Sequence, residues 1–261
     1  MILDTIALST KNRVEQAKEH VPYAEMQKKA LSIQANTPFC FEKALQSREL
    51  SFICEVKKAS PSKGLIAEDF PYLQIAQEYE SAGASAISVL TEPEFFQGNN
   101  TYLSQIKQAV SIPVLRKDFT VDDYQIYEAK VLGADAVLLI CALLNTDILA
   151  QYITVCDTLG LSALVEAHTE NEVQSALQAG ARVIGVNNRN LKTFEVDIST
   201  CTKLRALVPS NVVFVAESGI QTPQDIAALK QANVSAVLVG ETLMRSTNKK
   251  EELSRLRGDV L

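Results

Sequence analysis

The 261-residue chain contains no tryptophan, and aromatic residues make up only 6% of it. Its hydrophobic residues, 47% of the chain, are therefore mainly aliphatic. Such a core is typical of (β/α)8 barrels, whose interiors are filled by layers of branched aliphatic side chains. The length also fits, because one barrel usually takes about 250 residues. We therefore expect a single domain spanning residues 1–261.

Other classes of protein are excluded by what the chain has little of. Its five cysteines are scattered without a C-x-x-C pair, which is typical of reduced thiols in the cytoplasm. The longest apolar run, Ala136 to Leu144, has nine residues, whereas a membrane helix needs about 18 or more. The start of the chain carries an early acid and no long apolar region, so we expect no signal peptide. The net charge of −6 argues against nucleic-acid binding.

Metal and nucleotide motifs are missing as well. The two histidines, His20 and His168, lie far apart, and no His/Cys cluster surrounds either of them. No G-x-G-x-x-G follows the first predicted strand. We expect neither a metal nor a nucleotide cofactor.

Eight short apolar runs follow residue 50, with stretches long enough for a helix between them, such as 122–132 and 170–178. Strands that alternate with helices predict βαβ units and a parallel sheet. Eight of them favour closure into a (β/α)8 TIM barrel, with a doubly wound open sheet as the alternative. The runs are 52–56, 86–90, 113–115, 136–140, 163–165, 183–186, 212–215 and 236–239.

A weak repeat accompanies the runs. Gly83, Gly133, Gly180 and Asn233 each precede one of them, roughly fifty residues apart. Glycine or asparagine at this place indicates a helix end that needs a left-handed residue.

Residues 1–48 are predicted to be an N-terminal helical extension packed on the barrel, because no glycine or proline linker separates them from it. Asp4, Ser9 or Thr10 is a candidate cap for the start of its first helix.

Charged side chains stand at the ends of the predicted strands. Residues two apart in a strand share a face, so Glu55 and Lys57 point together, and Lys117 and Glu166 also point inward. The carboxyl ends of barrel strands are where active sites lie. Two lysines and two glutamates there predict acid–base chemistry on an anionic substrate. The alternative for Glu55 and Lys57 is a structural ion pair at the barrel mouth.

Three further strand ends carry polar residues. Asn187 and Arg189 share a face, and arginine can bind carboxylate or phosphate bidentately. His168 has two interpretations, a catalyst or an exposed loop residue, and the second is favoured.

The last two apolar runs end in glycine-containing segments, which are Ala216-Glu-Ser-Gly219 and Val239-Gly-Glu-Thr. Loops at these two places commonly bind phosphate in barrels.

These segments together resemble the indole-3-glycerol phosphate synthase family along the whole chain. The motifs that carry the resemblance, in order, are Ile53-Cys-Glu-Val-Lys-Lys-Ala-Ser-Pro-Ser-Lys-Gly64, Ser88-Val-Leu-Thr-Glu92 with Phe96 and Gly98, Pro113-Val-Leu-Arg-Lys-Asp-Phe119, Leu164-Val-Glu166, Gly185-Val-Asn-Asn-Arg-Asn-Leu191, Ala216-Glu-Ser-Gly-Ile220 and Val239-Gly-Glu-Thr-Leu-Met-Arg245. The resemblance implies a lyase of tryptophan biosynthesis. Its substrate would be 1-(2-carboxyphenylamino)-1-deoxyribulose 5-phosphate, whose pyrrole ring closes with loss of carbon dioxide and water.

The resemblance also implies residue roles. Lys117 matches the general acid and Glu166 the general base of the family. Lys57 matches the lysine that holds the substrate carboxylate, and a second candidate role for it is in the dehydration step. The remaining catalytic candidates are Glu55, which orients the lysines, and Asn187 and Ser218, which contact the substrate. The phosphate candidates are Ser60, Arg189, Gly219, Gly240 and the amide of Glu241, and the candidate walls for the aromatic ring are Phe96, Phe119 and Pro61.

Glu241 tests this mapping, because a carboxylate beside a phosphate repels it. We expect its backbone N–H, and not its side chain, to face the phosphate. Two alternatives remain open: a Schiff-base aldolase acting on a sugar phosphate, with Lys57 or Lys117 as nucleophile, and a catalytically silent barrel that serves as a partner subunit. We expect a cytoplasmic protein, monomeric or weakly dimeric, whose partner is a small anionic phosphate substrate and not a membrane or nucleic acid.

Overall fold

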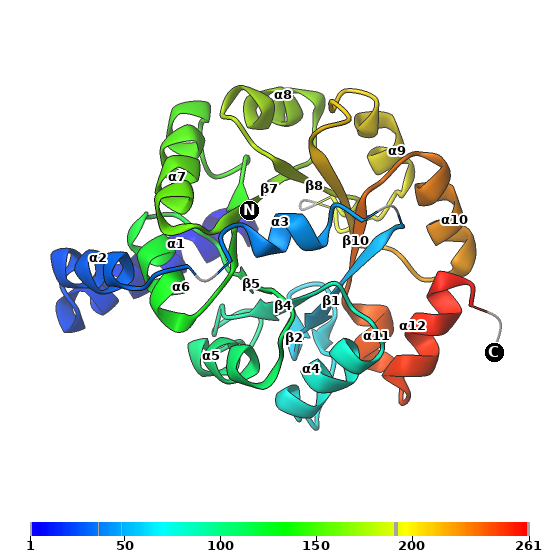
Figure 1. Cartoon of the computed structure of the whole chain (residues 1–261), viewed down its shortest axis with the longest axis horizontal. Coiled ribbons are helices and arrows are strands. Elements are labelled where there is room, and N and C mark those ends of the chain that lie inside the picture. The colour runs from blue at the N-terminus through cyan, green and yellow to red at the C-terminus, as the bar shows by residue number, and fades with distance from the viewer. Residues whose placement is uncertain (1, 36, 48, 191–192, 260–261) are drawn as a thin grey trace.

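Eight parallel strands of the described residues close into a barrel, which confirms the predicted fold and excludes the open sheet (Figure 1). The computed structural model describes residues 2–35, 37–47, 49–190 and 193–259, so Leu191, quoted in a motif above, lies outside them. Each strand overlaps one predicted apolar run, although several extend one to two residues beyond it. In chain order they are β1 (Ser51–Val56), β4 (Ala86–Leu90), β5 (Val114–Lys117), β6 (Ala136–Ile140), β7 (Ser162–Ala167), β8 (Val183–Asn187), β9 (Val213–Glu217) and β10 (Ala236–Val239).

Helices surround the strands on the outside of the barrel (Figure 1). Apolar side chains from helices and from the outward face of the strands form the larger core, and a second core fills the barrel. These helices are α4 (Tyr72–Ser81), α5 (Asn100–Ala109), α6 (Tyr124–Leu132), α7 (Thr146–Leu159), α8 (Glu170–Gln178), α9 (Ser199–Arg205), α10 (Pro223–Gln231), α11 (Glu241–Arg245) and α12 (Lys249–Arg257). A small hairpin of β2 (Ala59–Ser60) and β3 (Gly64–Leu65) follows β1.

The repeated glycine and asparagine positions end helices as predicted. Gly83, Gly133 and Gly180 have φ of +84°, +92° and +86°, and Asn233 has +57°. In each case the next residue donates its N–H to a helix carbonyl five positions earlier, over 2.9–3.1 Å, as Ala134 does to Ala129. This left-handed turn returns the chain to the next strand.

The N-terminal segment forms three helices: α1 (Ile2–His20), α2 (Tyr23–Ser32) and α3 (Cys40–Ala44). The predicted caps Asp4, Ser9 and Thr10 are wrong, because α1 already includes them. The helix begins earlier because one face of it, with Ile6 and Val14, is buried.

Helices α1 and α2 pack along one side of the barrel. The Arg13 guanidinium lies 2.7 Å from Asp118, just after β5, and the Tyr23 hydroxyl donates to Asp123 over 2.8 Å. Ile6 reaches the cavity at the barrel mouth. These contacts agree with a helical extension of one domain, which stays a prediction. None of the helices in the described ranges is long and apolar enough to cross a bilayer.

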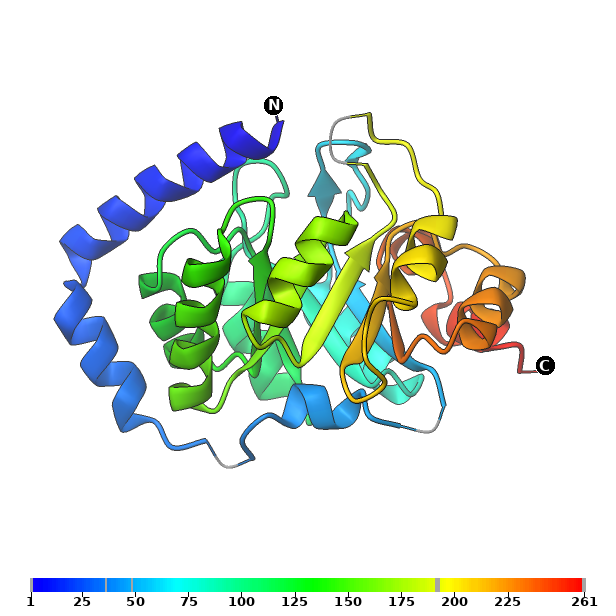
Figure 2. The same ribbon diagram turned by 90° about the horizontal axis from the view of Figure 1, so that it is seen from above.

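Helix α3 closes the amino-terminal end of the barrel (Figure 2). Phe41 and Leu45 are fully buried in the same cluster as inward-facing strand residues such as Ile53. Arg182, which precedes β8, donates to the Glu42 carboxylate over 3.1 Å and so fixes the helix in place. In the described part of the chain, α3 thus covers the end of the barrel opposite the carboxyl ends of the strands.

Replacing Phe41 with alanine is expected to lower the free energy of unfolding by about 3–5 kcal/mol, because the cavity it leaves is closed on all sides. Urea unfolding followed by circular dichroism measures the change. Leu8→Ala is the matched control, since Leu8 is 62% exposed. Equal midpoints for both variants would show that α3 does not seal the barrel.

Candidate active site

A cavity of about 500 Å³ opens at the carboxyl ends of the barrel strands. All the site residues predicted from the sequence line it, although they come from most of the strands and their loops. They are Glu55, Lys57, Ser60, Pro61, Phe96, Lys117, Phe119, Glu166, Asn187, Arg189, Ser218, Gly219, Gly240 and Glu241. Helix α1 adds Ile2, Leu3 and Ile6 to the wall.

Lys117 lies at the centre of the site. Its Nζ is 3.4 Å from a carboxylate oxygen of Glu166 and 3.4 Å from one of Glu217, and its side chain is 14% exposed. Burial lowers the pKa of Lys117, but the charges of Glu217 and Glu166 outweigh burial, and the net pKa is raised. The amine is therefore a cation at neutral pH and can act as a proton donor.

Glu55 and Lys57 point into the barrel together, as the strand alternation predicts. Lys57 Nζ lies 2.5 Å from a Glu55 oxygen. Gly240 makes room for this pair, because a Cβ at that position would overlap the Glu55 carboxylate. A side chain at position 240 would therefore displace the Glu55 carboxylate from its present place.

Glu166 is held from three directions. One oxygen faces Lys117, and the other lies 3.3 Å from both Asn187 Nδ2 and His168 Nε2. Burial raises the pKa of Glu166, but the Lys117 charge and the contacts with His168 and Asn187 lower it further, so the net pKa is lowered. Glu166 is therefore a carboxylate at neutral pH.

The interpretation of His168 as an exposed loop residue is wrong. Its side chain is only 15% exposed and lies between Glu166 and Glu172, 3.3 Å from each. The sequence signal for this placement is the acid four residues later, within reach of the ring.

Sequence reasoning missed Glu217, which is 2% exposed. It follows Val213 and Val215 on the inward face of β9, and this alternation could have revealed it. Its carboxylate occupies the space that a side chain at Gly185 would take. Burial and the neighbouring Glu166 and Glu55 charges raise the pKa of Glu217 to about 7, although Lys117 opposes them. Glu217 is thus the carboxyl of the site that can hold a proton.

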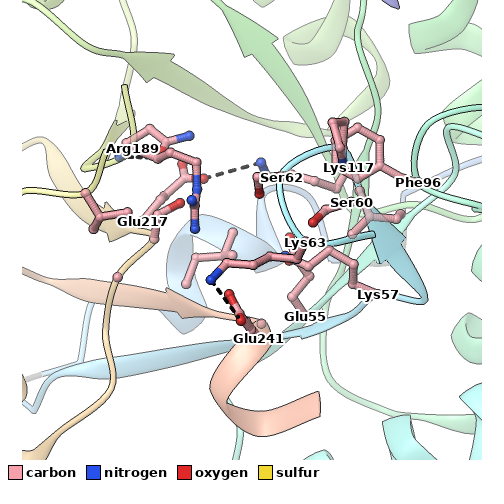
Figure 3. Close-up of a pocket in the computed structure, with 18 of the residues that line it drawn as sticks. Glu55, Lys57, Ser60, Ser62, Lys63, Phe96, Lys117, Arg189, Glu217 and Glu241 are labelled. Atoms are coloured by element: carbon pink, nitrogen blue, oxygen red, sulfur yellow. Dashed lines mark hydrogen bonds and ion pairs between the residues drawn. The ribbon is translucent and has the colours of Figure 1, made fainter. Parts of the chain in front are cut away.

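A second group missed by the sequence is Lys63, from the hairpin after β1. Figure 3 shows Lys63 and Glu241 directed toward each other, with Arg189 approaching from another side of the pocket. A Glu241 oxygen lies 3.3 Å from Lys63 Nζ and 3.1 Å from Arg245 Nε. The Glu241 carboxylate is therefore opposed by two cations, whereas the phosphate contact of its backbone stays a prediction.

The loop after β9 has an uncommon backbone. Ser218 has φ of +66° and Gly219 follows with +81°, and a non-glycine residue in this region is rare outside special turns. Asn188 supports the turn, because its side-chain amide donates to the Ser218 carbonyl over 3.1 Å. Asn188 is thus a loop-capping residue. Thr222 then caps α10 in a capping box with Asp225.

Phe96 and Phe119 form the apolar side of the cavity, with ring centroids 5.8 Å apart. The loop that carries Phe96 is fixed by the buried Glu92 carboxylate, which accepts backbone N–H groups from residues 94, 95 and 96 over 2.7–3.0 Å. Gly98 permits the loop to close, since a Cβ there would overlap the Leu90 carbonyl. Within the described ranges, no cluster of histidine, cysteine or acidic side chains suits a metal ion.

The chain is similar in sequence to one family throughout its length. A family model described as indole-3-glycerol phosphate synthase matches residues 3–256. A protein of that name from Ruminiclostridium cellulolyticum is 64% identical over 260 residues, 100% of each chain. The one from Endomicrobium trichonymphae is 56% identical over 98% of this chain and 100% of its own.

Solved structures show similarity of fold alone. A 3-hexulose-6-phosphate synthase superposes with a TM-score of 0.63 at 14% identity, over 81% of this chain and 100% of its own. Thiamine phosphate pyrophosphorylase from Pyrococcus furiosus superposes with a TM-score of 0.60 at 14% identity, over 80% of this chain and 94% of its own.

The raised pKa of Glu217 predicts a pH dependence of stability. The folded state holds this proton more tightly than the unfolded state, so its stabilisation is complete below pH 4.5 and is lost as pH rises through about 7. Glu217→Gln should therefore make the fall in unfolding free energy between pH 5 and 8 shallower. Urea titrations at several pH values measure the slope, with the exposed Glu19→Gln as control. An unchanged slope for Glu217→Gln would contradict the assignment.

Proposed function

The chain belongs to the indole-3-glycerol phosphate synthase family, and we propose that the cavity at the barrel mouth binds its substrate with the residues named below. The enzyme is a carboxy-lyase of tryptophan biosynthesis. The observation that carries the proposal is the buried Lys117 ammonium between two carboxylates, with cations beside it for an anionic substrate.

The substrate has three recognition features, and the cavity offers a place for each. Its phosphate fits the side with Arg189 and Lys63, near Ser60, Gly219 and Gly240. Its aromatic ring fits against Phe96, Phe119 and Pro61. Its carboxylate fits beside Lys57, which would then exchange part of its pairing with Glu55 for the substrate.

Lys117 is proposed to protonate the ketone oxygen while the ring carbon that bears the carboxylate attacks the ketone carbon. Loss of carbon dioxide from that ring carbon restores the aromatic ring, and the new hydroxyl takes a second proton from Lys57 and leaves as water. Glu166 takes the proton from the side of the anilino nitrogen, and Asn187 orients both Glu166 and the substrate. Ser218 contacts the substrate from the loop after β9.

We add Glu217 to the proposed catalytic residues, because its carboxylate contacts Lys117 as that of Glu166 does. When Lys117 gives up its proton, the carboxyl with the raised pKa is the nearest group able to restore it. A proton donor with a pKa near the working pH is also the most effective one.

A Schiff-base aldolase lacks support. Its nucleophile must be an uncharged amine, whereas the carboxylates beside Lys117 raise its pKa. Lys57 forms an ion pair with Glu55 at 2.5 Å. A catalytically silent barrel lacks support too, because every candidate catalytic group lines one cavity.

The proposed setting is the cytoplasm, supported by five free cysteines, of which Cys54, Cys156 and Cys201 are buried. The proposed assembly is a monomer or a weak homodimer. Large exposed apolar side chains such as Leu8, Leu31 and Leu65 belong to separate elements, and single ones need no partner.

Lys117→Ala is expected to lower the rate by roughly 10²–10⁴-fold, the usual contribution of a general acid. The readout is indole fluorescence during incubation with the anilino-deoxyribulose phosphate, which no tryptophan of this chain obscures. Lys11→Ala, on the exposed face of α1, is the control. An unaffected rate in Lys117→Ala would assign the acid role to Lys57, and no fluorescence from the folded wild type would overturn the proposal.

Glu241→Gln is expected to lower KM by roughly fivefold with little change in kcat. Removing a carboxylate near the phosphate relieves a repulsion of about 1 kcal/mol in water, and it releases Lys63 and Arg245 toward the ligand. Steady-state kinetics with Glu251→Gln as a surface control tests this. A higher KM would show instead that Glu241 holds Lys63 in its binding position.

A further inference from the structure

We propose that His168 is a positioning residue that fixes the carboxylate of Glu166 by tying it to the first turn of α8 through Glu172. The inference rests on the proposed role of Glu166 as the base. It adds a residue behind the base, since His168 is absent from the described residues that line the cavity.

The first step is the contact with Glu166. His168 Nε2 forms an ion pair with Oε1 of Glu166 at 3.3 Å, without the geometry of a hydrogen bond, and the same oxygen accepts a hydrogen bond from Asn187 Nδ2 over 3.3 Å. The other oxygen, Oε2, is left to face Lys117. These two contacts of Oε1 restrict rotation of the Glu166 carboxylate. Oε2 therefore keeps a fixed direction relative to Lys117.

The second step is the anchor of the ring. Oε2 of Glu172 lies 3.3 Å from His168 Nδ1 and also accepts the backbone N–H of His168 over 2.6 Å. Glu172 is fixed in turn because its own N–H donates to the side chain of the N-cap residue Thr169 over 3.2 Å. The ring therefore has a fixed place relative to the start of α8.

The third step is charge. Burial lowers the pKa of His168, but the neighbouring carboxylates of Glu166 and Glu172 outweigh it and raise the pKa to about 10. An imidazolium at this place favours the ionised form of Glu166, which a base requires. The other titratable groups around Glu166 are Lys117, Glu217 and the Cys141 thiol.

A purely structural role in capping α8 predicts a different outcome. The cap uses the Thr169 hydroxyl and the backbone N–H of His168, and neither involves the imidazole ring. Removing the ring while keeping the backbone leaves the cap in place. Effects on catalysis and on the cap are therefore separable.

The test compares His168→Gln with His20→Gln, which changes the other histidine of the chain, exposed on α1. For His168→Gln we expect kcat to fall roughly tenfold, equivalent to about 1.4 kcal/mol, with KM within about twofold of wild type. The acidic limb of the pH profile of kcat should move to higher pH, because the pKa of Glu166 rises when it loses a neighbouring cation. His20→Gln should match wild type in both. Glu172→Gln should also lower kcat, because the ring loses its anchor, and it stands in if His168→Gln does not fold.

Two results separate the possible failures. A wild-type kcat and pH profile in folded His168→Gln or Glu172→Gln, with Glu166→Gln inactive, would overturn the role of His168 alone. An active Glu166→Gln would overturn the base assignment on which it rests.

Discussion

The buried ammonium of Lys117 is the constraint around which the barrel mouth is built. A charge removed from water must be compensated where it lies, and Glu166 and Glu217 do so from β7 and β9. Their carboxylates need room, which explains why Gly185 faces the interior at a place where other strands carry side chains. The same cluster sets the proton affinities of the site, because one cation is shared by two acids of which only one is held fully ionised.

The outer side of β5 is fixed as firmly as its inner side. Arg116, 2% exposed, donates to Glu128 over 2.6 Å and to the Gln125 carbonyl over 2.9 Å. Asp118 accepts from Arg13 of α1 and from Thr91 after β4, both over 2.7 Å. Lys117 therefore sits between two anchored neighbours, and the N-terminal extension contributes to the placement of the central catalytic candidate.

Much of this arrangement could be predicted from the sequence, because strand alternation is strict. The inward direction of Glu55, Lys57 and Lys117 follows from the two-residue period of side chains along a strand. The helix ends follow from the positions of glycine and asparagine. Glu217 was missed since Ala216-Glu-Ser-Gly219 was interpreted only as a phosphate loop, although its strand extends to the acid. The placement of His168 could not be derived from periodicity, because it depends on a contact made after α8 has formed.

The seal formed by α3 has a consequence for the order in which the chain becomes structured. Glu42 is paired with Arg182, 140 positions later, and its backbone N–H donates to Ser162 over 3.3 Å. A ribosome adds about 5–20 residues per second. Roughly 7–28 s therefore pass between the synthesis of Glu42 and that of its partner Arg182. During that interval Phe41 and Leu45 are exposed apolar groups. The contacts that cover this end of the barrel are thus made by an early segment of the chain with segments that are synthesised much later.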